Sequence, residues 1–255
     1  MQIQLIRNAT LILQSGDKRL LVDPMLGGQG SFTPLAFLRY RPARNPTVPL
    51  PLVDLGGISC GLITHCQRGH LDHLDAAGTQ YLVQHKLPVY CNYLDERYLQ
   101  RRGIQTIALK PRQPQPFYGG TITPFPTAHG YGLIGKLMGH GVGYLIQLPG
   151  EPSLYISGDT VLTPTVKQVL TEYQPEIAVF AAGAAQLDIG KPILMPLPEM
   201  LEFIRLAPGR VIATHLEALN HCPMTRDQLR IALEQAGLLS KVAIPLDGEC
   251  LNFTA

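Results

Sequence analysis

The sequence of 255 residues lacks three features that would place it in a common class of protein. No apolar run reaches the roughly 18 residues that cross a bilayer, so no membrane span is predicted. Acidic and basic residues nearly balance, 19 against 21, without long runs of either sign, which argues against nucleic acid binding through a broad basic surface. The five cysteines form an odd set without paired spacing, which argues against a disulfide framework and favours a reducing compartment.

A secretory leader and a domain linker are also missing from the pattern. The first 13 residues alternate and are interrupted by Arg7 and Asn8, unlike a charged segment followed by an apolar one. We therefore expect a cytoplasmic protein. Hydrophobic residues make up 45% of the chain, enough for a sizeable core, and no repeat or low-complexity tract divides it. The sequence predicts a single domain, residues 1–255.

Apolar periodicity predicts a strand-rich first part followed by alternating strands and helices. An opening antiparallel meander is expected at 2–6, 10–14 and 19–22, with a Gly16-Asp17 turn. An irregular segment, 24–54, follows, and loops of this length are usually functional or cover something. Further strands are predicted at 58–64, 89–90, 106–109, 120–127, 143–148, 153–157, 176–180, 210–213 and 241–244, and helices at 71–82, 95–102, 164–173, 198–206 and 225–236. Such a pattern is typical of stacked sheets covered by helices.

Three histidines and an aspartate directly follow the strand predicted at 58–64. They lie within nine residues and are His65, His70, Asp72 and His73. Neutral imidazole and ionised carboxylate are the ligands that suit zinc and its divalent neighbours. This cluster therefore predicts a metal site at a strand-to-helix junction.

Three more candidate ligands share one placement, each just after a predicted strand. They are His129, Asp159 and His215. Loops at strand ends can converge while the strands hold them rigidly. We expect these side chains to join the first cluster in one site.

The order and spacing of these motifs resemble the metallo-β-lactamase-fold hydrolases across nearly the whole chain. The motifs are Thr64-His65, His70-Leu71-Asp72-His73, Thr127-Ala128-His129-Gly130, Ser157-Gly158-Asp159-Thr160 and Ala213-Thr214-His215. The opening hairpin with Leu21-Val22-Asp23-Pro24 is similar, more weakly, to the branch that contains ascorbate-6-phosphate lactonase. The resemblance implies an α/β (α+β) fold, a four-layer αββα sandwich.

The resemblance also implies a ligand set. His70 and His129 would bind one metal ion, Asp72, His73 and His215 would bind a second, and Asp159 would bridge both. Zinc, one or two ions per chain, is the expected cofactor, with manganese or iron as alternatives. Asp72 would also orient the attacking water.

The first metal ligand has three candidates. In the family the first histidine lies two residues before the second, where this sequence has Arg68. Either Cys66-Gln67-Arg68 is an insertion that leaves His65 able to coordinate, or Arg68 takes the slot with a guanidinium that cannot bind a cation. The second alternative leaves one metal at Asp72, His73, Asp159 and His215. Cys66, as a thiolate, is the third candidate.

Other polar residues have a functional and a structural interpretation. His221 is a predicted catalytic residue that would give a proton to the leaving group, or it holds, with Asn220, the loop of His215. Three arginines could form a lid over an anionic substrate or belong to a solvated loop; they are Arg39, Arg41 and Arg44. His85 and His140 are interpreted as hydrogen-bonded residues outside the site.

The sequence as a whole predicts a zinc-dependent hydrolase that uses metal-bound hydroxide on a small ester, lactone or phosphoester. One alternative is a degenerate protein of this fold that binds a metabolite or partner without turnover. Another is a mononuclear iron oxidoreductase. The expected partner is a small-molecule substrate, without nucleic acid or membrane, and a homo-oligomer is compatible with the sequence.

Overall fold

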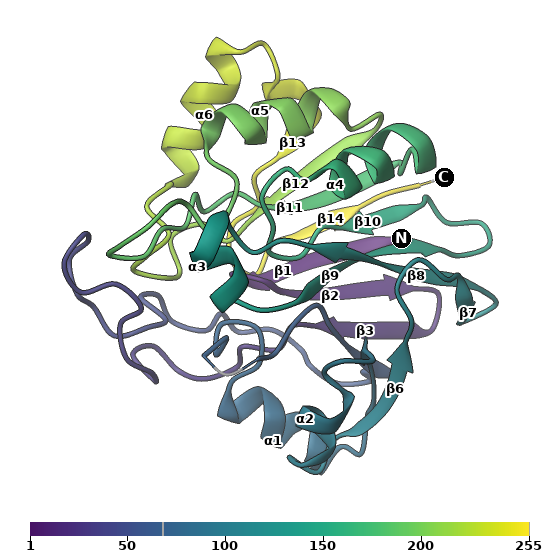
Figure 1. The fold of residues 1–255 in the computed structure, drawn as a ribbon. Coiled ribbons are helices and arrows are strands. Elements are labelled where there is room, and N and C mark those ends of the chain that lie inside the picture. Colours follow the sequence, from purple (N-terminus) through teal and green to yellow (C-terminus); the bar gives the residue numbers. More distant parts are fainter. Residues whose placement is uncertain (68, 255) are drawn as a thin grey trace.

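Two seven-stranded sheets lie face to face in the computed structural model, which describes residues 1–67 and 69–254, and helices cover the outer face of each sheet (Figure 1). The first sheet has the strand order β14, β1, β2, β3, β4, β5, β6, and the second has the order β13, β12, β11, β10, β9, β8, β7. The strands are β1 (Gln2–Arg7), β2 (Thr10–Ser15), β3 (Lys18–Val22), β4 (Cys60–Ile63), β5 (Pro88–Asn92), β6 (Gln105–Leu109), β7 (Gln115–Phe117), β8 (Gly120–Thr127), β9 (Gly141–Gln147), β10 (Leu154–Ile156), β11 (Ile177–Ala181), β12 (Arg210–Thr214), β13 (Val242–Ala243) and β14 (Cys250–Asn252). The helices are α1 (Ala76–Gln84), α2 (Glu96–Gln100), α3 (Gly132–Leu137), α4 (Pro164–Gln168), α5 (Leu197–Leu206) and α6 (Arg226–Gln235), with a π-helical segment at Val169–Tyr173 and a 3-10 turn at Leu239–Lys241.

Each sheet is antiparallel in one part and parallel in the other. Strands β14, β1, β2 and β3 pair antiparallel, and β3 to β6 pair parallel. In the second sheet β7 to β10 pair antiparallel, and β10 to β13 pair parallel. Parallel neighbours end at the same edge of a sheet, so β3 and β4 deliver their following loops together, and so do β10, β11 and β12.

Three apolar layers hold the sandwich together. Between the sheets, Leu62 of β4 belongs to the same buried cluster as Tyr144 of β9 and Val179 of β11. A second cluster, which includes Phe203 of α5, packs helices on the outer face of the second sheet. A third, which includes Leu82 of α1, does the same for the first sheet. The alternation of apolar side chains thus produces the αββα sandwich that the sequence predicts.

One predicted helix begins later than expected. The helix predicted at 71–82 begins at Ala76, because the Asp75 side chain accepts a hydrogen bond from the Gly78 amide and caps the helix. Asp72 therefore lies in a turn before α1 and not in its first turn. The sequence interpretation also missed α3, whose two glycines lower helix propensity, and the short edge strands β7 and β14.

The irregular segment 24–54 is anchored by a fully buried arginine. The Arg7 guanidinium donates hydrogen bonds to the backbone carbonyls of Met25, Gly27 and Val48. A charged group buried to this degree is stable only when such partners satisfy it. Within residues 1–67 and 69–254, no helix has the length and apolar content needed to cross a bilayer.

Candidate metal centre

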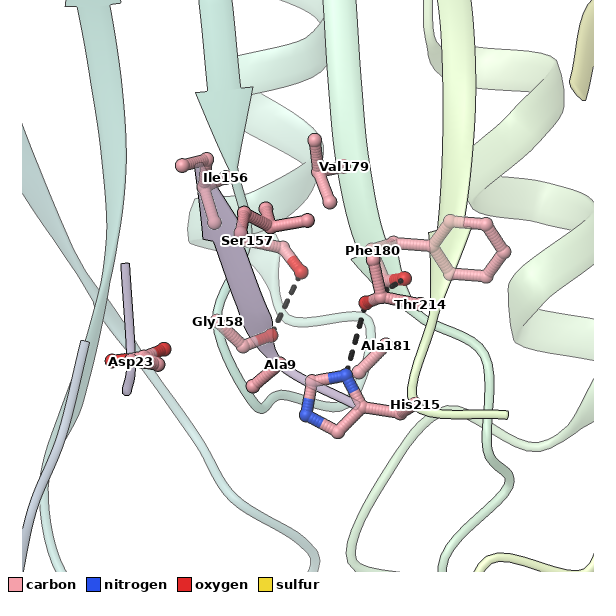
Figure 2. Close-up of a pocket in the computed structure, with 11 residues that line it drawn as sticks. Ala9, Asp23, Ile156, Ser157, Gly158, Val179, Phe180, Ala181, Thr214 and His215 are labelled. Carbon is pink, nitrogen blue, oxygen red and sulfur yellow. Dashed lines mark hydrogen bonds between the residues drawn. The ribbon is translucent and has the colours of Figure 1, made fainter. Parts of the chain in front are cut away.

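The candidate site lies where loops from both sheets meet. Figure 2 shows Asp23, which follows β3, beside the ends of β10, β11 and β12, with His215 directly after β12. These residues surround a gap of about 10 Å³, which has room for about one water molecule and none for a substrate. The chemistry therefore has to occur on the outer side of the strand ends.

Gly158 allows the two sheets to approach each other at this edge. Its φ is +61°, and a Cβ atom there would lie 2.8 Å from the Val142 carbonyl oxygen and 3.2 Å from Cβ of Thr64. A side chain would therefore push the end of β10 away from the end of β4. The neighbouring Asp159 can point into the site because glycine precedes it.

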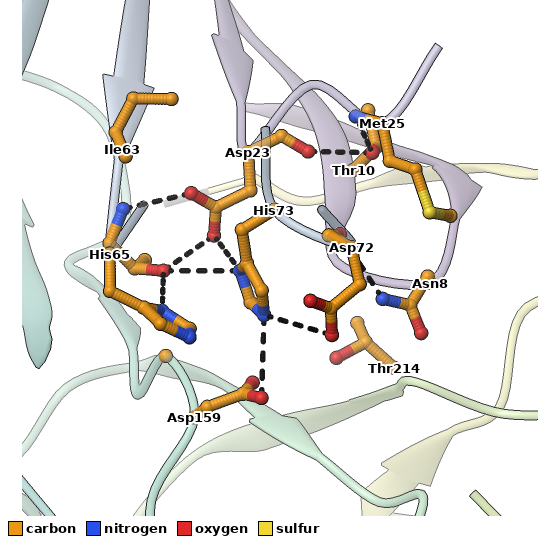
Figure 3. Close-up of polar contacts among 12 residues, drawn as sticks. Asn8, Thr10, Asp23, Met25, Ile63, His65, Asp72, His73, Asp159 and Thr214 are labelled. Carbon is orange, nitrogen blue, oxygen red and sulfur yellow. Dashed lines mark hydrogen bonds and ion pairs between the residues drawn. The ribbon is translucent and has the colours of Figure 1, made fainter. Parts of the chain in front are cut away.

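Asp23 is the hub of the polar contacts below the site (Figure 3). Its Oδ1 accepts a hydrogen bond from the Thr64 amide at 2.8 Å, and its Oδ2 accepts one from the Thr64 hydroxyl at 2.6 Å. His73 Nδ1 lies 2.9 Å from the same Oδ2. Because the Thr64 hydroxyl uses its one O–H to donate to Asp23, its oxygen accepts the hydrogen bond from His65 Nδ1 at 3.1 Å. Nδ1 of both histidines is therefore occupied by a hydrogen bond, and Nε2 is the nitrogen whose lone pair remains available to a metal ion.

The histidines of the second sheet are oriented in the same way. His129 Nδ1 donates to the Ile193 carbonyl at 2.8 Å. His215 Nδ1 donates at 2.9 Å to the hydroxyl of Thr214, which itself donates to the Phe180 carbonyl at 3.0 Å. A partner on one ring nitrogen that frees the other is the usual arrangement of metal-ligating histidine.

The free nitrogens converge around one carboxylate. Asp159 Oδ2 lies 3.3 Å from Nε2 of His73 and of His129, and its Oδ1 lies 2.9 Å from His215 Nε2. The ligand atoms of His65, His70 and His129 lie within 4.8 Å of one another, and so do those of His65, His73 and Asp159. Five of the candidate ligands have a buried ring nitrogen or carboxylate oxygen without a hydrogen-bond partner in the described residues: His65, His70, His73, Asp159 and His215.

The electrostatics at this position favour a positive charge. Burial alone would lower the pKa of His73, but Asp159, Asp23 and Asp72 raise it well above its usual range. Burial would raise the pKa of Asp159, yet His215 and His73 hold it well below its usual value. Carboxylates that stay ionised at full burial, next to unpartnered imidazole nitrogens, fit a divalent cation. The residues present thus fit the implied metal.

A cavity of about 230 Å³ opens above this cluster. Its polar lining consists of His70, Asp72, His129 and His221, and its apolar wall consists of Leu35, Leu137, Met138, Leu187 and Ile193. Leu35 comes from the irregular segment, which confirms that this segment lies beside the site. Asp72 Oδ2 lies 3.7 Å from His73 Nε2, so the carboxylate is placed between the ligand cluster and the cavity.

His221 lies in the cavity wall with its Nδ1 unpartnered among the described residues. Burial lowers the pKa of this ring to about 4, so it is neutral at pH 7. A neutral ring offers an N–H hydrogen bond and not the proton of an imidazolium. Asn220 beside it is a structural residue, because its side chain bonds Leu35, Ala36 and Asn45 of the irregular segment.

The structure separates the three candidates for the first ligand. His65 lies in both groups of ligand atoms. The Cys66 thiol packs in the core beneath the first sheet, and burial followed by the Asp95 charge raises its pKa, which disfavours the thiolate. Arg68 lies outside the described residues. The geometry thus favours His65.

The predicted arginine lid does not reach the cavity. Arg39 donates to the Leu187 and Asp188 carbonyls, and Arg44 donates to the Gly30 carbonyl. Among the described residues, none of the three candidate arginines lines the cavity. His85 packs against Tyr81 at the end of α1, with ring centroids 4.4 Å apart and ring planes tilted by 38°.

Asp23 is the residue that the sequence interpretation missed. The sequence placed it in the opening hairpin motif without a role at the site, whereas it orients His73 directly and His65 through the Thr64 hydroxyl. The available signal was an aspartate at the end of a strand that runs parallel to the one before His65. Side-chain direction at that position depends on its φ of +43°, which the sequence does not display.

No family model matches the chain. A curated relative, the UPF0173 protein YddR of Bacillus subtilis (strain 168), is 31% identical over 259 residues, which cover 99% of this chain and 100% of the relative. Further curated relatives with lower identity carry the name UPF0173 metal-dependent hydrolase.

Two solved structures are similar over nearly their whole length. The isothiocyanate hydrolase from Delia radicum gut bacteria is 31% identical, with a TM-score of 0.91 and full coverage of both chains. The metallo-β-lactamase-fold protein YhfI of Bacillus subtilis is 18% identical, with a TM-score of 0.66 and 98% of each chain covered. The second likeness concerns the fold alone.

Proposed function

This chain belongs to the UPF0173 family of metal-dependent hydrolases with the metallo-β-lactamase fold, as its motifs predict, and we propose that it hydrolyses a small uncharged electrophile with the help of zinc. One observation carries the proposal: four histidines have Nδ1 committed to a partner and Nε2 directed at one buried carboxylate or at its neighbours. The narrower likeness to the ascorbate-6-phosphate lactonase branch stays a prediction.

The cation would be held by the two ligand groups that share His65. His70 and His129 complete one group, and His73 and Asp159 complete the other. Asp159 also lies 3.3 Å from Nε2 of His129 in the first group, so it lies between the two groups and suits the predicted bridging role. When bound, the cation supplies a nucleophile at neutral pH and a Lewis acid for the substrate. Zinc, in one or two equivalents, agrees with a ligand set dominated by imidazole.

Asp72 and His221 are the groups of this chain that face the substrate. The Asp72 carboxylate is buried at the floor of the cavity and can accept a hydrogen bond from the attacking water. His221, neutral at pH 7, can donate its ring N–H to negative charge that develops on the substrate. We propose these two residues as catalytic.

The cavity wall argues for an uncharged substrate. Among the described residues that line the cavity, none is a lysine or arginine, and five are apolar. A phosphoester would therefore depend on the proposed metal ion alone to neutralise its negative charge, since none of the described residues that line the cavity has a cationic side chain. A volume of about 230 Å³ suits a compact ester or lactone. Of the three substrate classes predicted from sequence, the phosphoester is the least compatible.

An isothiocyanate is the second candidate substrate. A solved structure of an isothiocyanate hydrolase is 31% identical over the full length of both chains. An isothiocyanate is compact and uncharged, and water attacks its central carbon to give an amine and carbonyl sulfide. The apolar wall with few polar groups suits such a molecule as well as it suits an ester.

Elemental analysis together with a substrate panel tests the proposal. The purified protein is expected to hold about one or two zinc equivalents and to hydrolyse an aryl ester, a lactone or an aryl-alkyl isothiocyanate faster than a phosphodiester. Asp72→Ala should abolish turnover, whereas His85→Ala, at an exposed histidine away from the site, should behave as the parent. A protein without metal under every purification condition, or iron with oxygen consumption, would refute the zinc hydrolase in favour of the degenerate or the oxidoreductase alternative.

A further inference from the structure

Helix α3 forms part of the cavity wall and is held only partly by packing: Ile134 and, just after the helix, Met138 pack, partly buried, against the cluster that contains Ile193 and Leu194. The helix has no buried residue and is bounded by Gly132 and Gly139, whose φ angles are +59° and +84°. Leu137 and Met138 at its C-terminal end line the cavity. A six-residue helix is unstable by itself, so hydrogen bonds beyond its ends add to this packing in determining where it lies.

The C-terminal end of α3 is tied to two elements by His140. The His140 ring donates from Nε2 to Asp95 Oδ1 at 2.9 Å, and Asp95, just before α2, is almost fully buried. The His140 backbone carbonyl accepts a hydrogen bond from Gln67 Nε2 at 2.7 Å. Gln67 follows His65 by two residues, and its own carbonyl accepts from the His70 amide. One residue thus connects the cavity wall with the ligand loop.

The segment that follows α3 lies close to the loop that carries His65 and Gln67. A Cβ atom on Gly139 would lie 1.8 Å from Gln67 Oε1, so only glycine leaves room for the Gln67 amide beside this backbone. Beyond His140, the Val142 amide donates to the Thr64 carbonyl at 3.1 Å. The chain from Gly139 to Val142 therefore runs along the ligand loop in a fixed register.

We propose that His140 is a positioning residue that fixes the Leu137–Met138 wall and thereby determines the fit of the apolar part of the substrate. It belongs to neither ligand group and, among the described residues, is absent from the cavity lining, so it acts through α3. The role in substrate fit rests on the proposed hydrolase function. The attachment of α3 through His140 does not.

Trypsin cleavage tests the attachment without reference to activity. Lys136 is exposed in α3, and the rate of cleavage after it under native conditions reports how often the helix detaches. His140→Ala should raise this rate about fivefold, the effect expected for one lost hydrogen bond. His140→Gln, which can place an amide N–H near the Nε2 position, should restore the parent rate. Equal rates in His140→Ala, in the parent and in the control His85→Ala would overturn the attachment.

Steady-state kinetics tests the role in substrate fit. His140→Ala should raise KM for an aryl-alkyl substrate about fivefold, leave kcat within about twofold and leave zinc content unchanged, and His140→Gln should restore KM. A joint fall of kcat and zinc content would overturn the proposal, because His140 would then support the ligands. Unchanged KM despite faster trypsin cleavage would also overturn it. If the parent hydrolyses nothing, the proposed function fails, while the trypsin result still decides the attachment.

Discussion

The floor and the rim of the cavity contrast in how they are held. On the floor, each of four candidate ligand histidines is buried and has Nδ1 bonded to a carboxylate, hydroxyl or carbonyl. Around the rim, large apolar side chains are exposed: Phe37, Leu38, Leu133, Leu137 and Ile189 are between 56% and 86% exposed. The rim lies on α3 and on the segments near residues 24–54 and 186–194, whose cavity-lining side chains Leu35, Leu137, Met138 and Leu187 are half-buried or exposed.

This contrast indicates that the floor serves metal binding and turnover, and that the rim serves substrate preference. Strand ends position most of the floor, and the hydrogen bond from His129 Nδ1 to the Ile193 carbonyl couples it to the rim. Side chains of the rim can change without moving a candidate ligand, because the rim contacts His129 through the Ile193 backbone carbonyl and not through a side chain. We expect floor variants to lose metal and turnover together, and variants of the rim side chains that line the cavity to alter only substrate preference.

Asp159→Ala should have the largest effect, because it removes the carboxylate that contacts three ligand histidines. We expect kcat/KM to fall by about 1,000-fold or more and bound zinc to decrease. The parent should also gain thermal stability when zinc is added, through preferential binding to the folded state, and the variant should not. Elemental analysis and thermal unfolding with and without zinc measure both effects.

Asp227→Ala is the matched control, since this carboxylate is exposed on α6. It should retain zinc and turnover. A variant at Asp159 that kept its full zinc content would show that the floor does not need its central carboxylate, and the division between floor and rim would fail.

Asp23→Asn should have an intermediate effect. The amide keeps an acceptor for the Thr64 backbone but removes the charge that stabilises the Nδ1–H of His73. Loss of such an outer partner typically costs 10–100-fold in metal affinity or activity. Zinc titration followed by a competing chelator measures the affinity, and Asp54→Asn, at an exposed carboxylate, is the control. Equal zinc affinity in both variants would show that Asp23 does not support the metal site.

The floor of the cavity could be predicted from the sequence to a greater extent than the rim. The ligands of the floor follow strands, and strands show themselves through apolar periodicity, so His129, Asp159 and His215 could be identified from their positions. The sequence could not decide whether His65 or Arg68 takes the first ligand position. The path of this loop depends on the hydrogen bond from Gln67 to the His140 carbonyl, and these two residues are far apart in the sequence. Such a contact leaves no periodic signal.

The rim was largely beyond the reach of sequence patterns. Helix α3 is short and contains glycine, so tertiary contacts and not propensity stabilise it. The arginines of segment 24–54 suggested an anionic substrate, yet Arg39 and Arg44 satisfy backbone carbonyls of neighbouring loops. Composition revealed which groups were present, and only the fold determines where each of them points.

The smallest effect should come from a matched pair on α3, Leu137→Ala and Leu133→Ala. Both side chains are largely exposed, but of the two only Leu137 is among the described residues that line the cavity. Leu137→Ala should raise KM about two- to fivefold for a substrate with an apolar group, because part of its contact with the wall is lost. It should leave kcat, zinc content and the KM for a minimal acetyl ester unchanged. Leu133→Ala should match the parent in every measurement. Equal shifts in KM from both variants would mean that α3 affects binding as a whole, and that the wall has no contact with substrate at Leu137.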